Sequence, residues 1–369
     1  MSPKIPFNNL ALQWDEVSAA AQADIQALFV NSAFSGGRYV ETFERDIAAW
    51  LGTPHAIACS SGTAALHLAM VAAGIGPGDE VLVPAHTFIA TIWGVLYVGA
   101  TPVLCDVEDA TGNIDAADAA RRVTGRTRAI IPVHLYGQPA DLGAVQALAQ
   151  AHGLKVIEDN AQAIGARYDG VSLGCHGLMG CFSFYPGKNL GAAGEGGLVT
   201  TADDALAERL RRLRNHGQSE RYIHAEVGFN YRMDGIQGIV LRHKLPRLAD
   251  WTARRKQLAA AYAEGLAGLP LRLPETRHQD HVWHLHVVRA PERDALRAAL
   301  TAAGIETGLH YPVPNHRQPC LAGLASDPRG YPVSEAWAEQ GLSLPLFAGM
   351  TDAQLDQAIA AIRAFFAGR

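Results

Sequence analysis

Lysine is scarce in this chain. Lysine and arginine together number 31 among 369 residues, and the lysines are only Lys4, Lys155, Lys188, Lys244 and Lys256. A reaction that needs a lysine amine therefore has few candidates.

The cysteines are few and scattered. Cys59, Cys105, Cys175, Cys181 and Cys320 are odd in number and form no C-x-x-C pair, the spacing typical of zinc sites and redox dithiols. We expect buried or partly buried thiols of a reducing compartment, and no metal ion.

Positive charge and long apolar runs are also missing. The formal net charge is -5 and no basic stripe is visible, which argues against nucleic-acid binding. The most apolar stretch, residues 64–75, contains His67 and is too short to span a bilayer, and the N-terminus lacks a basic-then-apolar signal pattern. These features predict a soluble cytoplasmic protein without nucleic-acid or membrane partners.

Short apolar runs alternate with alanine-rich helical stretches between residues 56 and 201. Runs that are continuously apolar are typical of strands covered on both faces by helices. This pattern predicts an α/β domain with a mainly parallel sheet. The expected strands are 56–59, 81–83, 102–105, 129–133 and 155–158, with helices between them such as 63–73 and 141–152.

The flanking regions differ in character. We expect a first helix over 14–29, a glycine turn at Gly36-Gly37, and a largely helical stretch over 205–266. The C-terminal third has an α+β pattern, which predicts a domain of residues 1–250 followed by a smaller domain of residues 251–369. Its expected elements are strands 282–288 and 306–311 and helices 293–303 and 352–366.

Ligands of an open parallel sheet bind where strands end and the following helices begin. The first such place is Cys59-Ser60-Ser61-Gly62-Thr63, where small residues lead into a helix. Free N–H groups, hydroxyls and the helix dipole could bind a phosphate there, although an ordinary N-cap is an equal alternative. The segment is neither a Walker loop nor G-x-G-x-x-G, which disfavours nucleotide triphosphates and dinucleotides.

Two further strand ends carry an aromatic ring and an acid. Phe88 could stack on a flat cofactor, although a phenylalanine is more often a core residue. Asp159 ends a buried strand, so it needs a cation or strong donors, and a structural pair with an arginine is the alternative. Glu158 would point to the opposite face and is the better structural candidate.

The fourth strand end leads to a lysine. Lys188 lies among aromatic residues and is followed by Gly194-Glu195-Gly196-Gly197. Such surroundings suit a desolvated amine with a lowered pKa, the nucleophile of Schiff-base chemistry, rather than a solvated surface charge. A phosphate cradle, a stacking ring, a buried carboxylate and an amine together match the needs of pyridoxal 5'-phosphate.

The sequence also resembles a known family, the pyridoxal-phosphate-dependent sugar aminotransferases called DegT/StrS, which have the aspartate aminotransferase fold (type I). The resemblance implies a large domain with a seven-stranded, mainly parallel sheet flanked by helices, and a small α+β C-terminal domain. It is carried, in the family's order, by Phe34-Ser35-Gly36-Gly37, Phe43-Glu44, Ser61-Gly62-Thr63-Ala64-Ala65-Leu66, Gly78-Asp79-Glu80-Val81, Pro132-Val133-His134-Leu135-Tyr136-Gly137-Gln138, Glu158-Asp159, the Lys188 segment and His310-Tyr311-Pro312.

The resemblance implies a role for each matching residue. Lys188 carries the Schiff base to the cofactor, Asp159 pairs with the pyridinium nitrogen and Gln162 contacts the phenolic oxygen. Phe88 stacks on the ring. The phosphate is bound by Gly62, Thr63, Ser183 and, from the neighbouring subunit, Asn230. The resemblance therefore implies an obligatory homodimer. Asn160 departs from the small residue often found after the family's aspartate.

An intact lysine at position 188 favours transamination, because a branch of the family that dehydrates sugars has histidine there. The expected reaction moves the amino group of L-glutamate, through pyridoxamine 5'-phosphate, to a nucleotide-linked keto-deoxy-sugar. Residues 310–319 resemble the segment of members that act on dTDP-3-keto-6-deoxyhexoses. Candidate contacts to the sugar or diphosphate are Tyr185, His216, Tyr222 and His310.

Three alternatives remain open at this point. The acceptor could be a 4-keto-sugar linked to UDP or GDP, or a keto-cyclitol without a nucleotide. A non-enzymatic, cofactor-binding regulator would normally need an effector domain, for which we see no spare segment.

Overall fold

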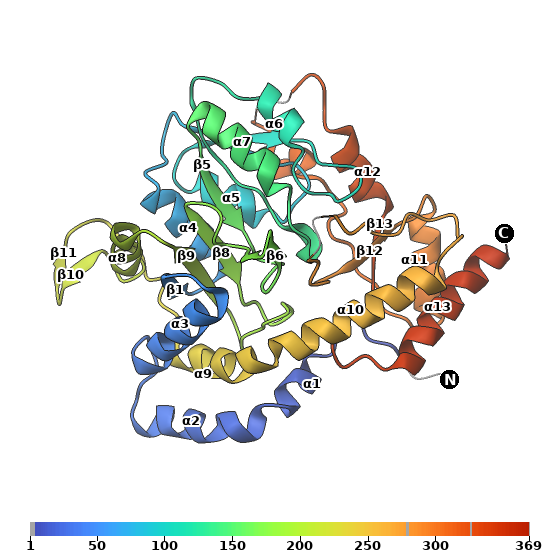
Figure 1. Ribbon diagram of the computed structural model, residues 1–369, viewed down its shortest axis with the longest axis horizontal. Helices are drawn as coiled ribbons and strands as arrows, with labels where there is room; N and C mark the ends of the chain where they lie inside the picture. The colour runs from blue at the N-terminus through green and yellow to red at the C-terminus, as the bar shows by residue number, and fades with distance from the viewer. Residues whose placement is uncertain (1–3, 278–279, 325–326, 369) are drawn as a thin grey trace.

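A seven-stranded sheet forms the centre of the computed structural model, which describes residues 4–277, 280–324 and 327–368. The strand order is β1-β9-β8-β5-β4-β2-β3 (Figure 1). Neighbouring strands are parallel except at β9, which runs antiparallel to both β8 and β1. The prediction of a mainly parallel sheet is therefore confirmed. The strands are β1 (His55–Cys59), β2 (Glu80–Pro84), β3 (Thr101–Cys105), β4 (Thr127–Ile130), β5 (Lys155–Asp159), β8 (Met179–Ser183) and β9 (Gly197–Thr201).

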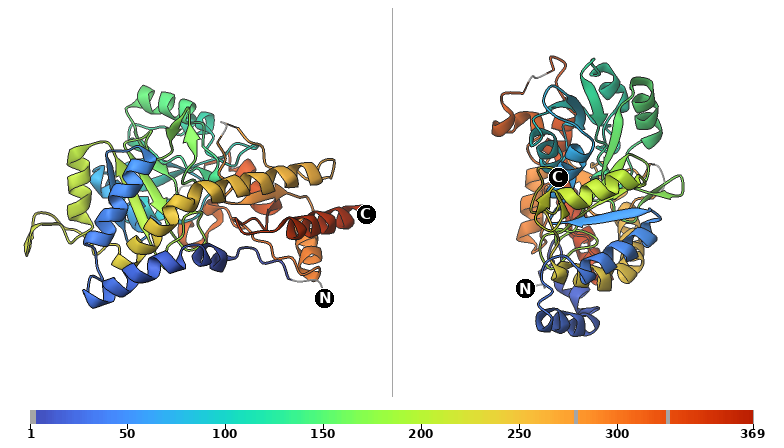
Figure 2. Two further views of the ribbon diagram at one scale, coloured as in Figure 1. Left: turned by 60° about the horizontal axis from the view of Figure 1, so that its bottom comes forward. Right: turned by 90° about the vertical axis from the view of Figure 1, so that its left-hand side faces the viewer.

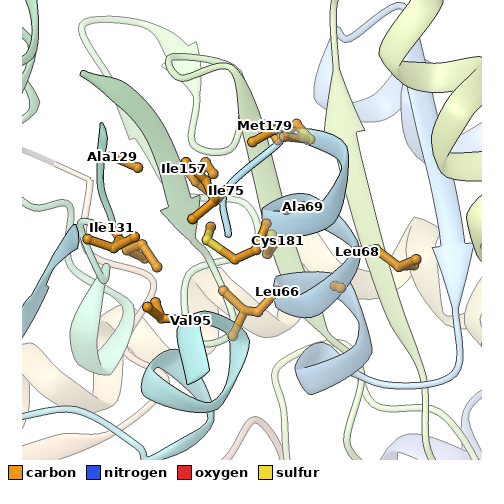
Figure 3. Packing of buried hydrophobic residues seen from close by; sticks show 14 of the residues in the cluster. Leu66, Leu68, Ala69, Ile75, Val95, Ala129, Ile131, Ile157, Met179 and Cys181 are labelled. Carbon is orange, nitrogen blue, oxygen red and sulfur yellow. The ribbon is translucent and has the colours of Figure 1, made fainter. Parts of the chain in front are cut away.

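Helices cover both faces of this sheet, which explains why its strands are continuously apolar. Along β1, Ile57 packs toward α4, whereas its neighbours Ala56 and Ala58 pack toward α3. Figure 3 shows Leu66 and Ala69 of α4 beside side chains of β5 and β8. One face carries α4 (Gly62–Ala72), α5 (Ala90–Leu96) and α8 (Asp204–Leu213), and the other carries α3 (Arg38–Leu51), α6 (Ala116–Arg121) and α7 (Leu142–His152).

The first predicted helix is divided in two. Helix α1 (Leu10–Asp15) is followed by α2 (Ser18–Val30), so a single helix over 14–29 is wrong. The break leaves Glu16 where its carboxylate accepts hydrogen bonds from Arg247 at 2.9 Å and from Trp251 Nε1 at 3.2 Å.

The predicted helical stretch over 205–266 contains an unexpected hairpin. Its strands β10 (Gln218–Glu220) and β11 (Ile223–His224) lie between α8 and α9 (Gly235–Lys244), and α10 (Leu248–Gly265) follows. The ends of the hairpin meet closely at Gly217, where a Cβ would lie 1.8 Å from the carbonyl oxygen of Glu226. The hairpin projects beyond α8, away from the rest of the chain (Figures 1 and 2).

The C-terminal region has the expected α+β character, with corrections. Strand β12 (His286–Arg289) is shorter than predicted because Trp283 has a φ of 50° and interrupts the extended chain. It pairs only with β13 (Gly341–Leu344). The predicted strand over 306–311 is wrong: Gly308 alone forms a bridge, to Ser343, and the chain then turns toward the large sheet. The helices are α11 (Arg293–Ala302), α12 (Pro332–Gln340) and α13 (Asp352–Ala367).

Helix α10 crosses the predicted domain boundary at residue 250. Its first residue, Leu248, packs with α3, whereas Leu258 packs with α11 and α13 in the C-terminal apolar cluster. Ile5 belongs to the same C-terminal cluster. The division into residues 1–250 and 251–369 therefore stays a prediction. Within the described ranges, no helix has both the length and the apolar character needed to cross a membrane.

Candidate active site

Lys188 lies in a tight loop between β8 and β9. The loop is closed by hydrogen bonds from Lys188 N to the carbonyl of Tyr185 and from Ala192 N to the carbonyl of Phe184, both 2.8 Å. Burial lowers the pKa of the Lys188 amine to about 8, although the Asp159 carboxylate acts in the opposite direction. A larger fraction of this amine is therefore uncharged near neutral pH than for an ordinary lysine, as nucleophilic catalysis requires.

Asp159 ends β5 and is 4% exposed. Its Oδ2 accepts a hydrogen bond from Thr91 Oγ1 at 2.7 Å, and its Oδ1 accepts one from Ala161 N at 3.1 Å. Burial raises the pKa of this carboxyl group, against the effects of these donors and of Lys188. Over the described part of the chain Asp159 has no ion pair with an arginine. The alternative role, a structural ion pair with an arginine, is therefore not observed, and a positively charged group of a ligand would suit this carboxylate.

The adjacent Glu158 has the structural role expected of it. It is fully buried and accepts backbone hydrogen bonds from Gly174, His176 and Gly177, each at 2.8 Å. His134 Nε2 lies 3.2 Å from its Oε2. Burial acts to raise the pKa of Glu158, but His134 and the amides of Gly174 and Gly177 outweigh it, so the pKa is lowered.

A candidate phosphate cradle lies where α4 begins. Ser61 is the N-cap and its Oγ accepts from Ala64 N at 3.1 Å, as the N-cap alternative expected. The N–H groups of Gly62 and Thr63 still point out of the first turn, where the helix dipole favours an anion. A Cβ at Gly62 would lie 2.7 Å from Ser183 Cβ. Glycine therefore lets the end of β8 bring Ser183 against this helix terminus.

Gln162 and Phe88 lie close to the same segment of the C-terminal region. Gln162 Oε1 accepts from Tyr136 N at 2.6 Å, and its Nε2 donates to Tyr311 Oη at 3.0 Å, which leaves one amide N–H for a ligand. Phe88 is 52% exposed, and its ring centroid is 5.6 Å from that of Tyr311. Phe88 is thus not a core residue and offers a ring face.

The four tentative substrate residues fall into two groups. His310 is near Lys188, since burial and the lysine charge lower the His310 pKa to about 4, and Tyr185 is 54% exposed in the lysine loop. By contrast, His216 and Tyr222 are exposed at the projecting hairpin, as is Asn230 after it. Within one chain, His310 and Tyr185 therefore lie near Lys188, whereas His216 and Tyr222 do not.

Sequence reasoning missed His284, which lies beside Lys188. Asn189 donates through Nδ2 to the carbonyl of Val282 at 3.0 Å, so its Oδ1 faces His284 Nδ1 at 3.2 Å. The imidazole proton is therefore on Nδ1, and Nε2 carries a lone pair. Burial and the Lys188 charge lower the His284 pKa well below its usual value. His281 and His286 lie close to it in the sequence, and no local pattern indicates which of the three histidines belongs to the site.

Thr91, Tyr136 and Tyr311 were also missed as site residues. Thr91 is buried under Asp159, and Tyr136 and Tyr311 hold Gln162. Each belongs to a segment that the sequence singled out, but nothing local indicated its partner.

The residues present fit pyridoxal phosphate. The cradle at Gly62 excludes a Cβ but leaves N–H donors for a phosphate, the buried Asp159 has no arginine partner among the described residues, and Lys188 supplies an amine of lowered pKa. These are the anchors that this cofactor needs.

Comparison with known proteins defines the class. A model of the DegT/DnrJ/EryC1/StrS aminotransferase family matches residues 15–363. The chain belongs to this family, and it is a transaminase.

The similar proteins cover nearly the whole chain. A dTDP-3-amino-3,4,6-trideoxy-alpha-D-glucose transaminase of Streptomyces venezuelae is 46% identical over 364 residues, 98% of this chain and 96% of the relative. A UDP-N-acetyl-3-dehydro-alpha-D-glucosamine 3-aminotransferase of Acidithiobacillus ferrooxidans is 45% identical over 360 residues, 97% of each.

Solved structures agree with this assignment. The crystal structure of S. venezuelae DesV matches with a TM-score of 0.96 and 46% identity over 99% of both chains. NtdA from Bacillus subtilis with bound cofactor PMP matches with a TM-score of 0.91 and 30% identity, over 99% of this chain and 85% of that one. The family and fold predicted from sequence are confirmed, as is the expected cofactor class.

Proposed function

We propose that this protein transfers the amino group of L-glutamate to a nucleotide-linked keto-deoxy-sugar, a dTDP-3-keto-6-deoxyhexose, in amino-sugar biosynthesis. The observation that carries the proposal is the grouping of Lys188, Asp159 and the Gly62 cradle at the strand ends of a transaminase fold. The names of both relatives above refer to amination at carbon 3 of a nucleotide-linked sugar, which favours that position. They differ in the nucleotide, so a UDP-linked sugar is the nearest alternative, and a 4-keto-sugar or a keto-cyclitol is more distant.

The cofactor would be held by this chain's own residues. Gly62, Thr63 and Ser183 would hold the phosphate of pyridoxal 5'-phosphate, and Asp159 the ring nitrogen. Gln162 would donate its remaining N–H to the ring oxygen, and Phe88 would lie on the ring face. When bound, the cofactor supplies an electron sink for the carbon that loses or gains a proton.

Lys188 performs the proton transfers in this proposal. Its uncharged Nζ removes the α-proton of L-glutamate. Hydrolysis then releases the carbon skeleton as 2-oxoglutarate, while the amino group would stay with the cofactor for transfer to the sugar. In the second half of the reaction Nζ returns a proton to the sugar carbon that becomes bonded to nitrogen. A pKa of about 8 suits both tasks, because a general acid and base works best with a pKa near the working pH.

The active site would be completed by a second copy of the chain. His216, Tyr222 and Asn230 are exposed and lie on or beside the projecting hairpin. Its apolar side chains are unusually exposed, with Tyr222 at 76% and Val227 at 88%, as expected of a segment that is covered in a dimer. We propose that Asn230 contacts the phosphate in the partner subunit's site.

An absorption experiment tests the reaction. The visible absorption of cofactor bound to Lys188 should disappear on adding L-glutamate and return on adding dTDP-3-keto-6-deoxyhexose. Lys188→Ala should do neither, whereas the matched variant Lys4→Ala, at a lysine that is 72% exposed, should behave as wild type.

Two other results of the absorption experiment would change the proposal. Loss of the absorption without its return would keep the glutamate half-reaction and reject this sugar, and the UDP-linked sugar and the keto-cyclitol would be tried next. Absence of the absorption in cofactor-saturated wild type would reject the mechanism.

A further inference from the structure

Tyr136 is a buried junction between the large sheet and two segments of the C-terminal region. It lies in a 3₁₀ turn, η1 (Leu135–Gly137), with a φ of 60°, and is 4% exposed. Its N–H donates to Gln162 Oε1 and its carbonyl accepts from Leu285 N at 3.2 Å. Its Oη donates to the carbonyl of His310. All the polar groups of Tyr136 are therefore used, and each reaches a different segment.

The protons in this network can be placed. The carbonyl of His310 can only accept, so the phenolic proton of Tyr136 points to it. His86 Nε2, 2.7 Å from the same Oη, must then be the donor. His86 is 1% exposed, its Nδ1 has no partner among the described residues, and burial together with the Arg289 charge lowers its pKa to about 3. A neutral imidazole with its one proton on Nε2 thus supports the Tyr136 hydroxyl.

The three segments held by Tyr136 all carry site residues. Gln162 is oriented by the N–H of Tyr136, and its Nε2 in turn holds Tyr311, whose ring meets Phe88. The His310 carbonyl is fixed by the hydroxyl, while the His310 imidazole meets Ser343 Oγ at 2.8 Å. His284 adjoins Leu285, the partner of the Tyr136 carbonyl. Of these contacts, only that of the hydroxyl is removed by a side-chain substitution at Tyr136, because the other two are made by its backbone.

We propose that Tyr136, supported by His86, is a positioning residue that fixes the His310-Tyr311 segment over the cofactor site and so sets the binding of the keto-sugar. This inference rests on the proposed function. The two contacts of Tyr136 should affect the half-reactions differently. The contact from its N–H to Gln162 should affect cofactor binding, and therefore both half-reactions. The contact from its hydroxyl to the His310 carbonyl should affect only the binding of the acceptor sugar.

The test compares two phenylalanine variants that lose the same group. Tyr136→Phe removes the hydroxyl at the junction. Tyr262→Phe is the matched control, because Tyr262 is also buried and its Oη also donates to a backbone carbonyl, that of Pro345 at 3.0 Å, within the C-terminal region. Amide hydrogen exchange of residues 308–316 is measured on the apoprotein, and each half-reaction is measured on the cofactor-loaded enzyme.

We expect exchange at residues 308–316 to be about tenfold faster in Tyr136→Phe, as for the loss of one buried hydrogen bond, and unchanged in Tyr262→Phe. The KM for dTDP-3-keto-6-deoxyhexose should rise about tenfold in Tyr136→Phe alone, with the visible spectrum and the glutamate half-reaction within about twofold of wild type.

Two results would overturn the inference. One is exchange at residues 308–316 that is unchanged in Tyr136→Phe or equally raised in both variants. The other is an equal loss in both half-reactions of Tyr136→Phe, which would indicate a structural role. A wild-type enzyme that fails to react with glutamate would instead refute the proposed function, and the exchange measurement would still decide whether Tyr136 fixes this segment.

Discussion

Glu158 and Asp159 are adjacent buried carboxylates, and their replacement by amides should have opposite consequences. Strand geometry directs the two side chains to opposite faces of β5. Glu158→Gln should lower the stability of the apoprotein and leave the chemistry of the site largely intact. Asp159→Asn should leave stability intact and remove most of the activity.

The magnitude for Glu158 follows from its donors. Oε1 accepts from His176 N and Gly177 N, and Oε2 accepts from Gly174 N and His134 Nε2. A glutamine amide places N–H groups against at least one of these donors and removes the charge from the remaining bonds. We expect a loss of about 3–5 kcal/mol in the free energy of unfolding, as for breaking a buried charged network.

The expected effect of substitution on the free energy of unfolding is different at Asp159. Among the described residues it accepts hydrogen bonds from Thr91 Oγ1 and Ala161 N alone, and burial raises its pKa. Its ionised form is therefore disfavoured in the folded apoprotein. Asp159→Asn should therefore be as stable as wild type or more stable at neutral pH. Without the carboxylate, the ring nitrogen of the cofactor would lose the partner proposed for it, and the glutamate half-reaction should slow by about 10²–10³-fold.

Denaturant unfolding of the apoproteins as a function of pH tests whether Glu158 stabilises the fold and whether Asp159 destabilises it, as the directions of their pKa shifts predict. The lowered pKa of Glu158 contributes stability that is present above its ordinary value of 4.5 and is lost as the pH falls through the folded value. The raised pKa of Asp159 lowers stability as the pH rises above 3.8. The wild-type curve should therefore fall more steeply at acid pH than that of Glu158→Gln, and Asp159→Asn should gain most at neutral pH.

This reasoning would be refuted by equal loss of stability in the two variants. It would also be refuted if folded Glu158→Gln lost the glutamate half-reaction as completely as Asp159→Asn, since the two faces of β5 would then not be separate in function.

Three further predictions concern the cofactor site. The rate at which apoprotein attaches pyridoxal phosphate, followed by visible absorption, should rise with pH through about 8 as the Lys188 amine loses its proton, and level off above it; a rate independent of pH would contradict the lowered pKa. Gly62→Ala should weaken cofactor binding by about tenfold or more, because its Cβ would lie 2.7 Å from Ser183 Cβ, whereas Gly125→Ala, with nothing within 4 Å, should bind normally in the same titration. Mixing inactive Lys188→Ala with inactive Asn230→Ala should restore activity, because a hybrid dimer contains one intact site; no recovery after verified subunit exchange would reject a shared site.

Much of the fold was predictable because its signals are local. The apolar strands of the sheet, the helices that cover it and the polar residues at strand ends all appear as short patterns around Gly62, Asp159 and Lys188. The errors occurred where distant contacts override such patterns. The expected strand over 306–311 is replaced by an irregular segment because Gly308 alone reaches a strand and His310 bonds to Tyr136 instead. Residues 218–224 form a hairpin that projects from the chain (Figure 2).

The sequence by itself determined the class of fold, the few lysines available and the four groups that a pyridoxal phosphate site needs, because each depends on residues close together in the chain. Only the tertiary structure decided that Tyr136 reaches His310, 174 residues away, and that His284 contacts Asn189, the neighbour of Lys188. It also decided that His216 and Tyr222 lie away from their own chain's lysine. These contacts form when separate elements dock, and hydrogen-bond partners at such separations leave no periodicity in the sequence.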